Sequence, residues 1–327
     1  MRIAVTGSIA TDHLMVFPGR FAEQLLKEQL ERVSLSFLAD RLEVRRGGVG
    51  ANIAFGLGLL GLDPVLVGAA GVDFAEYGAW LRAGGVDTAE VRVSATLHTA
   101  RFVCTTDQDQ NQIATFYAGA MAEASMIDLA AVTARTGKPR LVLVGADDPG
   151  AMLRHTATAH RLGIPVAADP SQQLARLDRD EARQLVDGAR WLFTNEYEAA
   201  LLLDRTGWTE QHLLDRVGSW ITTLGEGGVS LAGSGAKALR IAAVPADRIA
   251  DPTGAGDGFR SGFLAGTAWG CTPEQSARLG CALATTVLES VGTQEYKLTP
   301  SDLVARIDRT YGPETARALE PRLAPVS

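Results

Sequence analysis

Asp251-Pro252-Thr253-Gly254-Ala255-Gly256-Asp257-Gly258 is the stretch around which this chain of 327 residues is interpreted. Gly254 and Gly256 leave backbone N–H groups open to a ligand, and apolar residues at helical spacing follow. A glycine loop that opens a helix can hold a phosphate through these N–H groups and the positive end of the helix dipole. Asp257 falls in the first turn, where the dipole favours its ionised form. The stretch therefore predicts a fixed carboxylate beside an anion site, whereas a plain helix N-cap would need neither Thr253 nor Asp257.

Composition narrows the class of protein. The chain is 46% hydrophobic and carries a net charge of −7, without a block of basic residues, which argues against a nucleic-acid or membrane partner. Its three cysteines, Cys104, Cys271 and Cys281, are odd in number and far apart, which predicts free thiols in a reducing compartment. The first seven residues form a predicted strand that is too short for a signal sequence. Together these features predict a cytoplasmic protein.

The middle of the chain alternates strands and helices. Predicted strands at Leu141–Gly145, Val166–Ala168 and Trp191–Thr194 are separated by helical patterns, as in the βαβ units of a parallel sheet. A first strand at Ile3–Thr6 ends shortly before Asp12. Because ligands bind at the carboxyl ends of such strands, polar residues that follow them are candidates for a site. The pattern predicts an α/β domain with a mostly parallel sheet.

Two segments interrupt this alternation. Residues 13–46 contain a Pro-Gly break, a helical segment at Phe21–Leu30 and alternating apolar residues, and the strand-like runs Thr99–Thr106 and Gln112–Ala118 follow later. We expect residues 13–46 and 97–118 to form a small sheet outside the main one, where it would act as a lid.

Familiar nucleotide motifs are absent or misplaced. The run Gly56-Leu57-Gly58-Leu59-Leu60-Gly61 matches G-x-G-x-x-G, but a helical pattern precedes it and a strand follows, which is the reverse of the dinucleotide fingerprint. The sequence also lacks G-x-x-x-x-G-K-[ST]. A nucleotide would therefore need another phosphate site.

Two strand ends offer that site. Asn195 and Glu198 follow a predicted strand, where a carboxylate could hold Mg²⁺ through water, although the same pair is equally suited to capping the next helix. The run Thr223-Leu224-Gly225-Glu226-Gly227-Gly228 is a second glycine loop between two strands, and as a tight hairpin it needs no ligand.

The octapeptide resembles the D-T-x-G-A-G-D signature of the ribokinase family, also called the phosphofructokinase B family, with Pro252 replacing the usual hydroxyl residue. Asp12, the loop Gly47–Asn52, Asn195 with Glu198, and Thr223–Gly228 fall in the family's order, so the resemblance extends from residue 3 to about residue 292. It implies a ribokinase-like three-layer αβα fold with a mostly parallel sheet and a small β-sheet lid, built as one domain over residues 1–327.

The resemblance also implies roles for individual residues. Asp257 is similar to the general base, and Gly254, Ala255 and Gly256 to the anion hole. The expected ATP-binding residues are Asn195, Thr223, Leu224, Gly225, Glu226, Gly227, Gly228 and Gly256, with Glu198 holding Mg²⁺ through water. The expected substrate-binding residues are Ser8, Asp12, Gly48, Asn52, Phe102, Phe116, Gln173, Arg176 and Asp257. The resemblance further implies ATP as the phosphate donor, Mg²⁺, a homodimer through the lid and a fold that can accommodate an activating monovalent cation.

The substrate is predicted from the lid. Phe102 and Phe116 lie on its expected strands, where aromatic rings could stack on a flat base. The segment Phe17–Phe21 is similar to that of bacterial adenosine kinases of this family, which favours phosphorylation of adenosine at its 5′-hydroxyl. The sequence leaves three alternatives: rings that only pack the lid, a sugar substrate such as ribose or fructose, or a nucleoside-binding regulatory protein.

Overall fold

The computed structural model describes residues 2–24 and 36–323. Its main sheet is built from strands β1 (Ile3–Thr6), β4 (Val65–Val67), β9 (Leu141–Val144), β10 (Val166–Ala168), β11 (Trp191–Asn195), β12 (Ser219–Thr223), β13 (Val229–Ala232) and β14 (Leu239–Ile241). The spatial order is β14-β13-β12-β11-β10-β9-β1-β4, and every pairing from β4 to β12 is parallel. The strand β13 pairs antiparallel with both β12 and β14. The prediction of a mostly parallel sheet is confirmed.

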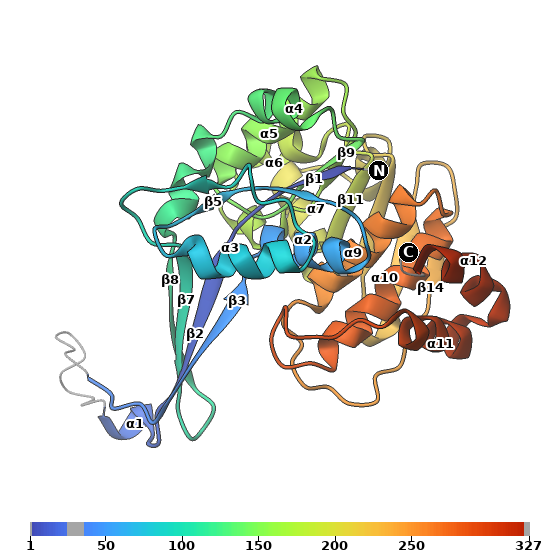
Figure 1. Ribbon diagram of the computed structural model, residues 1–327. Helices are drawn as coiled ribbons and strands as arrows, with labels where there is room; N and C mark the ends of the chain where they lie inside the picture. Colours follow the sequence, from blue (N-terminus) through green and yellow to red (C-terminus); the bar gives the residue numbers. More distant parts are fainter. Residues whose placement is uncertain (1, 25–35, 324–327) are drawn as a thin grey trace.

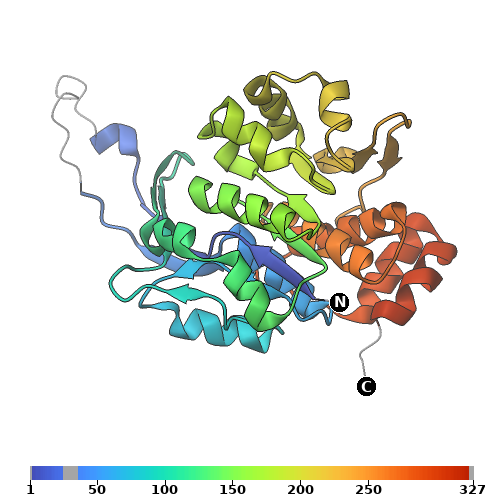
Figure 2. The ribbon, with the colours of Figure 1, turned by 90° about the horizontal axis from the view of Figure 1, so that it is seen from above.

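Helices cover both faces of this sheet because successive strand residues point to opposite sides. In β1, Ile3 and Val5 belong to one core and Ala4 to the other. The first core is covered by α2 (Val49–Leu59), α3 (Phe74–Ala83), α9 (Ala255–Ala268), α10 (Pro273–Leu288), α11 (Pro300–Tyr311) and α12 (Pro313–Leu323). The second is covered by α4 (Leu129–Thr136), α5 (Pro149–Arg161), α6 (Arg179–Val186), α7 (Glu196–Thr206) and α8 (Glu210–Leu214). The result is the predicted three-layer arrangement (Figures 1 and 2).

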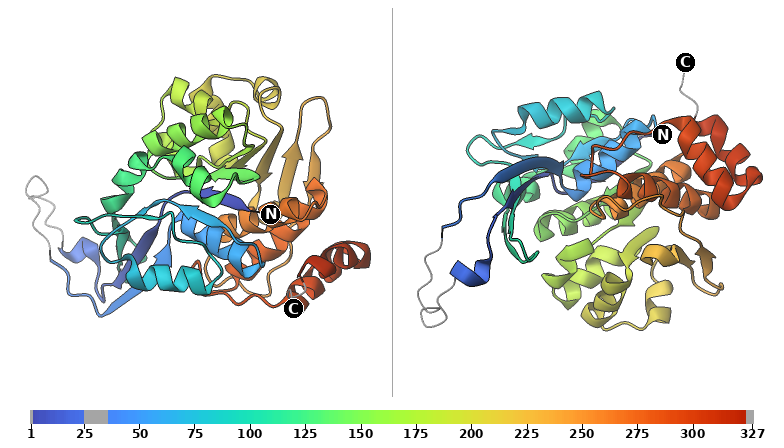
Figure 3. Two further views of the ribbon diagram at one scale, coloured as in Figure 1. Left: turned by 45° about the horizontal axis from the view of Figure 1, so that its top comes forward. Right: turned by 90° about the horizontal axis from the view of Figure 1, so that it is seen from below.

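The chain ends in the pair α11 and α12, which continues the first helical layer beyond α10 (Figure 3). Further along the same layer, the rejected G-x-G-x-x-G run lies within and just after α2 and is followed by β4. Between the two layers a short sheet pairs β5 (Ala69–Ala70) with β6 (Arg92–Val93). Within residues 2–24 and 36–323, no helix combines the length and apolar character needed to cross a membrane.

A separate sheet projects from the main body, as predicted for the lid (Figure 1). It consists of β2 (Ala10–Val16), β3 (Arg41–Gly47), β7 (Ala100–Thr106) and β8 (Gln112–Tyr117), in the order β3-β2-β7-β8. This lid sheet starts at Ala10, three residues earlier than the predicted boundary at residue 13. Of the expected helical segment Phe21–Leu30, the structure describes α1 (Phe21–Gln24), and residues 25–35 lie outside the described part of the chain.

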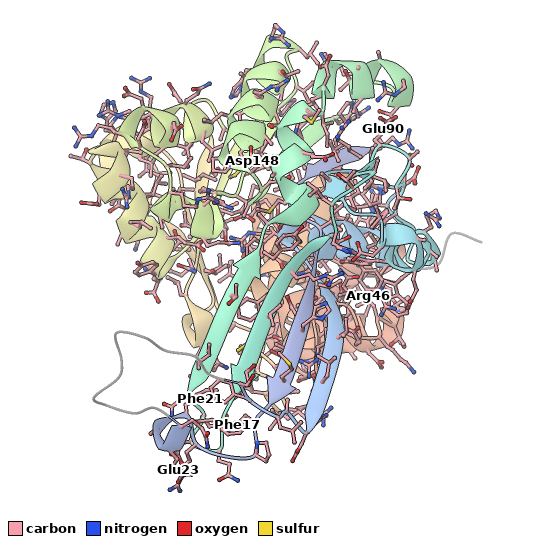
Figure 4. The ribbon with its side chains drawn as sticks, turned by 90° about the vertical axis from the view of Figure 1, so that its left-hand side faces the viewer. Phe17, Phe21, Glu23, Arg46, Glu90 and Asp148 are labelled. Atoms are coloured by element: carbon pink, nitrogen blue, oxygen red, sulfur yellow. The ribbon has the colours of Figure 1, made fainter. Side chains whose placement is uncertain are left out.

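The far end of the lid sheet is held by an aromatic cluster. The rings of Phe17, Phe21 and Phe37 have centroids 4.9 to 5.7 Å apart. The carboxylate of Asp107 accepts a hydrogen bond from the backbone N–H of Phe21 at 3.0 Å, which ties the cluster to the β7–β8 turn. Phe17 and Phe21 lie beyond the ends of the long lid strands, away from the main sheet (Figure 4).

Candidate active site

The strand ends of the main sheet and the base of the lid sheet enclose two adjoining hollows. Ser8, Ala146 and Gln172, which line the first hollow, follow the carboxyl ends of β1, β9 and β10. Asn195 and Thr223, which line the second, are the last residues of β11 and β12. This placement is expected for ligand sites in open parallel sheets.

The first hollow, here called the acceptor cavity, has a volume of about 490 Å³. All nine predicted substrate residues line it, namely Ser8, Asp12, Gly48, Asn52, Phe102, Phe116, Gln173, Arg176 and Asp257. Phe102 of β7 and Phe116 of β8 are paired across the two strands. The cavity therefore has an aromatic end on the lid and a carboxylate on the main body.

The second hollow, here called the phosphate cleft, has a volume of about 620 Å³. Among the predicted donor-site residues it is lined by Asn195, Glu198, Thr223, Gly225 and Gly256. Leu224, Glu226, Gly227 and Gly228 do not line it, and neither does Ala255. The four in the loop form the β12–β13 hairpin turn, in which the N–H of Leu224 donates to the carbonyl of Gly228 at 2.9 Å.

The two hollows meet at the start of α9. Gly254 and Asp257 line both of them. Gly254 has φ of +79°, and a side chain there would bring a Cβ within 2.9 Å of Thr293 Cγ2. Glycine is therefore required for the backbone to turn into the helix at this point. The turn places the first N–H groups of α9 and the carboxylate of Asp257 at one junction, as the octapeptide predicts.

Asp257 differs from the expectation in its ionisation. Burial raises its pKa to about 7, against the opposing effects of a hydrogen bond from Asn52 and the positive charge of Arg260. The prediction from the sequence took account of the helix dipole alone, which favours the ionised form, whereas burial favours the protonated form. A carboxylate with a pKa near 7 is better matched to accepting a proton at neutral pH than an ordinary aspartate.

Asn52 is oriented by a buried polar network. Its Nδ2 donates to Asp257 Oδ2 at 2.8 Å. Its Oδ1 accepts from Thr293 Oγ1 at 2.9 Å and from Gln294 Nε2 at 2.8 Å, which assigns the amide orientation. Gln294 also contacts the hydroxyl of Tyr77 at 2.6 Å, and that hydroxyl donates to the carbonyl of Gly47 at the end of β3. Hydrogen bonds thus connect the root of the lid sheet with Asp257.

Asp12 is the acidic residue of the acceptor cavity on the lid side. It lies in β2 opposite Arg45 of β3 and beside Phe102 of β7. Burial raises the pKa of Asp12 to about 6, while Arg45 opposes the shift and Asp251 adds to it. The side chain is therefore mostly ionised at neutral pH and can accept hydrogen bonds from hydroxyl groups of a ligand.

Asn195 and Glu198 form the capping box that the sequence left open. Asn195 Oδ1 accepts from the N–H of Glu198 at 2.8 Å, and Glu198 Oε2 accepts from the N–H of Asn195 at 2.8 Å. Both residues also line the phosphate cleft. Capping α7 and lining the cleft are thus compatible, because the cap uses Oδ1 of Asn195 and Oε2 of Glu198 and leaves Asn195 Nδ2 and Glu198 Oε1 outside it.

The chain is similar to known proteins of one family. The family model described as pfkB family carbohydrate kinase matches residues 7–300. The chain belongs to this family. Membership confirms the family predicted from the octapeptide and places the chain among kinases.

Relatives of this pfkB-family chain extend over most of its length. A nucleoside kinase of Methanothermobacter thermautotrophicus is 30% identical over 291 residues, covering 88% of this chain and 92% of that protein. The structure of a Burkholderia thailandensis nucleoside kinase with inosine is 34% identical, with a TM-score of 0.83 and coverage of 96% and 99%. The same Burkholderia protein in its ADP-inosine complex gives a TM-score of 0.79 at 34% identity, with coverage of 96% and 97%. The predicted ribokinase-like fold is confirmed.

The residues of the pfkB-family cleft suit Mg²⁺ with few protein ligands. Glu198 supplies hard carboxylate oxygens at the cleft wall, and its Oε1 lies 3.3 Å from Ser171 Oγ. Over residues 2–24 and 36–323, no cluster of three or more His, Cys, Asp or Glu side chains is arranged for a metal. Mg²⁺ retains much of its water and takes one or two carboxylates plus phosphate oxygens, so a lone glutamate fits it.

Several lining residues were not predicted as site residues. In the acceptor cavity these include Met121, Gln172 and Thr293, and in the phosphate cleft they include Ser171, Tyr197 and Arg260. Gln172 adjoins the predicted Gln173, and Arg260 lies three residues after Asp257, so proximity in sequence offered a signal for these two. Met121 and Thr293 reach the cavity only through the tertiary structure.

Proposed function

We propose that this chain is an ATP-dependent nucleoside kinase whose substrate is adenosine, phosphorylated at the 5′-hydroxyl. The observation that carries the proposal is the pairing of Phe102 with Phe116 at the lid end of a cavity whose other end is Asp257. A base between or against two rings and a ribose hydroxyl near the carboxylate would fill such a cavity along its length. The names of the relatives, and the inosine and ADP-inosine complexes of the Burkholderia protein, support a nucleoside acceptor and ATP as donor.

The reaction transfers the γ-phosphoryl group from ATP to the nucleoside. The bond between the 5′-oxygen and phosphorus forms while the bond from phosphorus to the β-phosphate oxygen breaks, leaving ADP and a nucleoside 5′-monophosphate. Asp257 accepts the hydroxyl proton, at a late stage in which that oxygen has become acidic through bonding to phosphorus. Asn52 Nδ2, which donates to Asp257 Oδ2 at 2.8 Å, leaves the other carboxylate oxygen for this proton.

Most of the rate enhancement would come from alignment and charge stabilisation, because the transition state of phosphoryl transfer is loose. The first N–H groups of α9, beginning at Gly254, would receive the charge that develops on the transferred group. Glu198 and Asn195 would hold Mg²⁺ with its water, and the bound ion would neutralise phosphate charge. Thr223 and Gly225 at the opposite wall of the cleft would contact the donor phosphates.

The alternatives weighed from the sequence make different use of the cavity. A free sugar such as ribose or fructose could be gripped by Asp12 and Asn52, but it would leave the aromatic pair without a partner. A regulatory nucleoside-binding protein would need the pair, but neither the pKa shift of Asp257 nor the junction with the phosphate cleft. The aromatic pair and the junction together favour the nucleoside kinase.

An assay of ADP release with a panel of acceptors tests the proposal. The panel contains adenosine, inosine, cytidine, ribose and fructose, each with ATP and Mg²⁺ and with K⁺ or Na⁺ as the salt. We expect the highest kcat/KM with adenosine. A higher value with ribose or fructose would overturn the nucleoside assignment, a higher value with inosine or cytidine would replace adenosine, and no ADP release with any acceptor would favour the regulatory protein.

We also propose that residues 1–327 form one domain, in which residues 13–46 and 97–118 supply most of the lid. The lid sheet would mediate a homodimer. The outer strand β8 is exposed at every position, and the apolar residues Ile113 and Tyr117, on the face opposite the acceptor cavity, are 46% and 43% exposed. Leu42 and Val44 of β3 are 59% and 58% exposed. A second copy would bury this surface. Sedimentation at micromolar concentration should report twice the mass of the chain, and a monomer would contradict the dimer.

A further inference from the structure

The helix that follows the octapeptide carries a buried charge. Arg260 is only 5% exposed and lies in α9 between Phe259 and Ser261, which are also buried. Burying a guanidinium is costly unless it is paired and hydrogen-bonded. A helix that only had to pack against the sheet would carry an apolar residue here. The buried charge therefore indicates an ion-pair partner or a functional role. Arg260 also lines the phosphate cleft.

Arg260 contacts three segments that are distant in sequence. Its Nη2 donates to Asp169 Oδ1 at 2.6 Å, and its Nε lies 2.6 Å from Asp169 Oδ2. Its Nη1 donates to the carbonyl of Gly256 at 3.1 Å, and Nη2 lies 4.0 Å from Glu198 Oε2. Asp169 follows the end of β10, Gly256 is in the first turn of α9, and Glu198 is in the first turn of α7. One planar group thus spans the anion site and the metal-side carboxylate.

The segment that follows Asp169 lines the phosphate cleft through Ser171. Two residues after Asp169, Ser171 adopts φ of +47°, a conformation that costs a residue other than glycine some free energy. The Ser171 hydroxyl approaches Glu198 Oε1 at 3.3 Å. The segment after β10 therefore reaches Glu198 through Ser171, while Arg260 approaches the same carboxylate from α9. Two contacts thus converge on Glu198, one from the segment after β10 and one from α9.

Charge balance gives Arg260 a further effect. Asp169, Glu198 and Asp257 are the carboxyl groups near Arg260, and of these Glu198 and Asp257 line the cleft. The positive charge of Arg260 lowers the pKa of Asp257, whereas Asp169 and Glu198 raise it, each by less than the effect of Arg260. Without the guanidinium, Asp257 would be protonated to a higher pH.

We propose that Arg260 is a positioning residue for phosphoryl transfer, which holds the first turn of α9, the end of β10 and Glu198 in one fixed arrangement around the transferred group. The inference rests on the proposed kinase function and adds a residue to its site. Because the two hydrogen bonds that the guanidinium donates go to Asp169 and the Gly256 carbonyl, it acts through these groups. A simple structural ion pair would stabilise the fold without affecting the reaction.

The test compares Arg260→Gln, Arg260→Lys and the double variant Arg260→Gln with Asp169→Asn. Arg260→Gln leaves Asp169 buried without its cation, so the variant alone should lose stability. The double variant removes both charges and should regain most of the lost melting temperature. As a matched control, Arg306→Gln breaks the Arg306–Glu289 pair, which spans 2.6 Å outside both hollows.

The measured quantities are kcat, the pH dependence of kcat/KM, and calorimetric binding of MgADP without acceptor. We expect the double variant to recover stability while kcat stays tenfold to hundredfold below wild type, the loss expected when reacting groups shift by about 1 Å. The decrease of kcat/KM on the acid side should occur at higher pH in the double variant than in wild type. Removing Arg260 raises the pKa of Asp257 more than removing Asp169 lowers it. Arg260→Lys should restore the pH profile and part of kcat, and Arg306→Gln should change neither.

Two outcomes would overturn the inference. The first is a double variant with wild-type kcat, pH profile and MgADP affinity, since Arg260 would then be only a structural ion pair. The second is wild-type behaviour of Arg260→Gln itself. These outcomes can be told apart from a failure of the adenosine proposal. The kcat can be measured with any acceptor that supports ADP release, and MgADP binding is measured without an acceptor. Weaker MgADP binding in the double variant than in wild type would support the inference even then.

Discussion

The two walls that meet at Asp257 are built differently. On the main-body side, Asp169 and Arg260 are 0% and 5% exposed, and the phosphate cleft is lined by strand ends and helix starts anchored in the two large cores. On the lid side, Phe116 is 52% exposed and β8 has no buried position. Phosphoryl transfer needs groups that are already in place, because reorganisation at the moment of reaction raises the barrier. Recognition of a nucleoside needs a surface that the ligand itself can cover.

The two walls are nevertheless connected. Gly47, at the end of β3, accepts from Tyr77, and the chain of hydrogen bonds continues through Gln294 and Asn52 to Asp257. Ligand contacts at the root of the lid can therefore influence the orientation of the carboxylate. The following experiments separate what each wall contributes, in order of decreasing effect.

Replacing the carboxylate at the junction should have the largest effect. Asp257→Asn keeps the size of the side chain but cannot accept the hydroxyl proton, so kcat should fall about a hundredfold or more. Nucleoside binding by calorimetry and melting temperature should stay close to wild type. Asp147→Asn is a matched control, because burial raises the pKa of Asp147 to about 8 and it lines neither hollow. Wild-type turnover of Asp257→Asn would remove Asp257 as the base.

Removing one ring from the lid should affect affinity more than turnover. Phe102→Ala or Phe116→Ala takes away a base contact worth about 1–3 kcal/mol, which corresponds to about a tenfold to hundredfold loss of adenosine affinity. Ile113→Ala changes the same strand on its other face and should leave affinity unchanged. The mass of each variant is measured first by sedimentation. If both ring variants keep wild-type mass and affinity, the rings only pack the lid.

The pH dependence should distinguish the two acidic residues. Because Asp257 must be deprotonated to act and has a pKa of about 7, kcat/KM should fall about tenfold for each pH unit below 7. Asp12, with a pKa of about 6, should add a further decrease below pH 6 that acts through weaker nucleoside binding. In Asp12→Asn this second decrease should vanish while the first remains. A profile that stays flat down to pH 5 would contradict both assignments.

The smallest effect is expected at the metal-side cap. Glu198→Gln should raise the Mg²⁺ concentration needed for half-maximal rate several-fold, while adenosine binding without ATP stays unchanged. The capping box of α6, made by Asp178 and Glu181, provides the control, because Glu181→Gln alters the same type of cap far from the cleft. If the two variants share one loss of stability and wild-type Mg²⁺ dependence, Glu198 is only a cap.

Local sequence was most informative where one segment forms a complete feature. Gly254–Asp257 combines the loop, the helix start and the carboxylate in four residues, and the structure places them together as predicted. The strands of the main sheet were readable because buried strands form short apolar runs between turns. The substrate residues were predicted only with the help of the family resemblance, and all nine line one cavity.

Other properties depended on residues that approach one another only in the folded chain. Asp169 and Arg260 are 91 residues apart in sequence, and Asn52 and Gln294 are 242 apart, so no spacing rule links them. The ionisation of Asp257 could not be predicted either. The helix dipole can be inferred from the position of a residue in a helix, but desolvation depends on every group that surrounds the side chain.

The sequence by itself determined the order of strands and helices, the glycine turn before α9 and the family, because these follow from local conformational preference and short apolar patterns. Tertiary structure decided that Asp257 has a pKa of about 7, that Arg260 joins three segments, and that Phe102 and Phe116 face the same cavity. The physical reason is that burial and charge pairing are sums over neighbours in space. Such neighbours are assembled only when both sheets and their helices have packed.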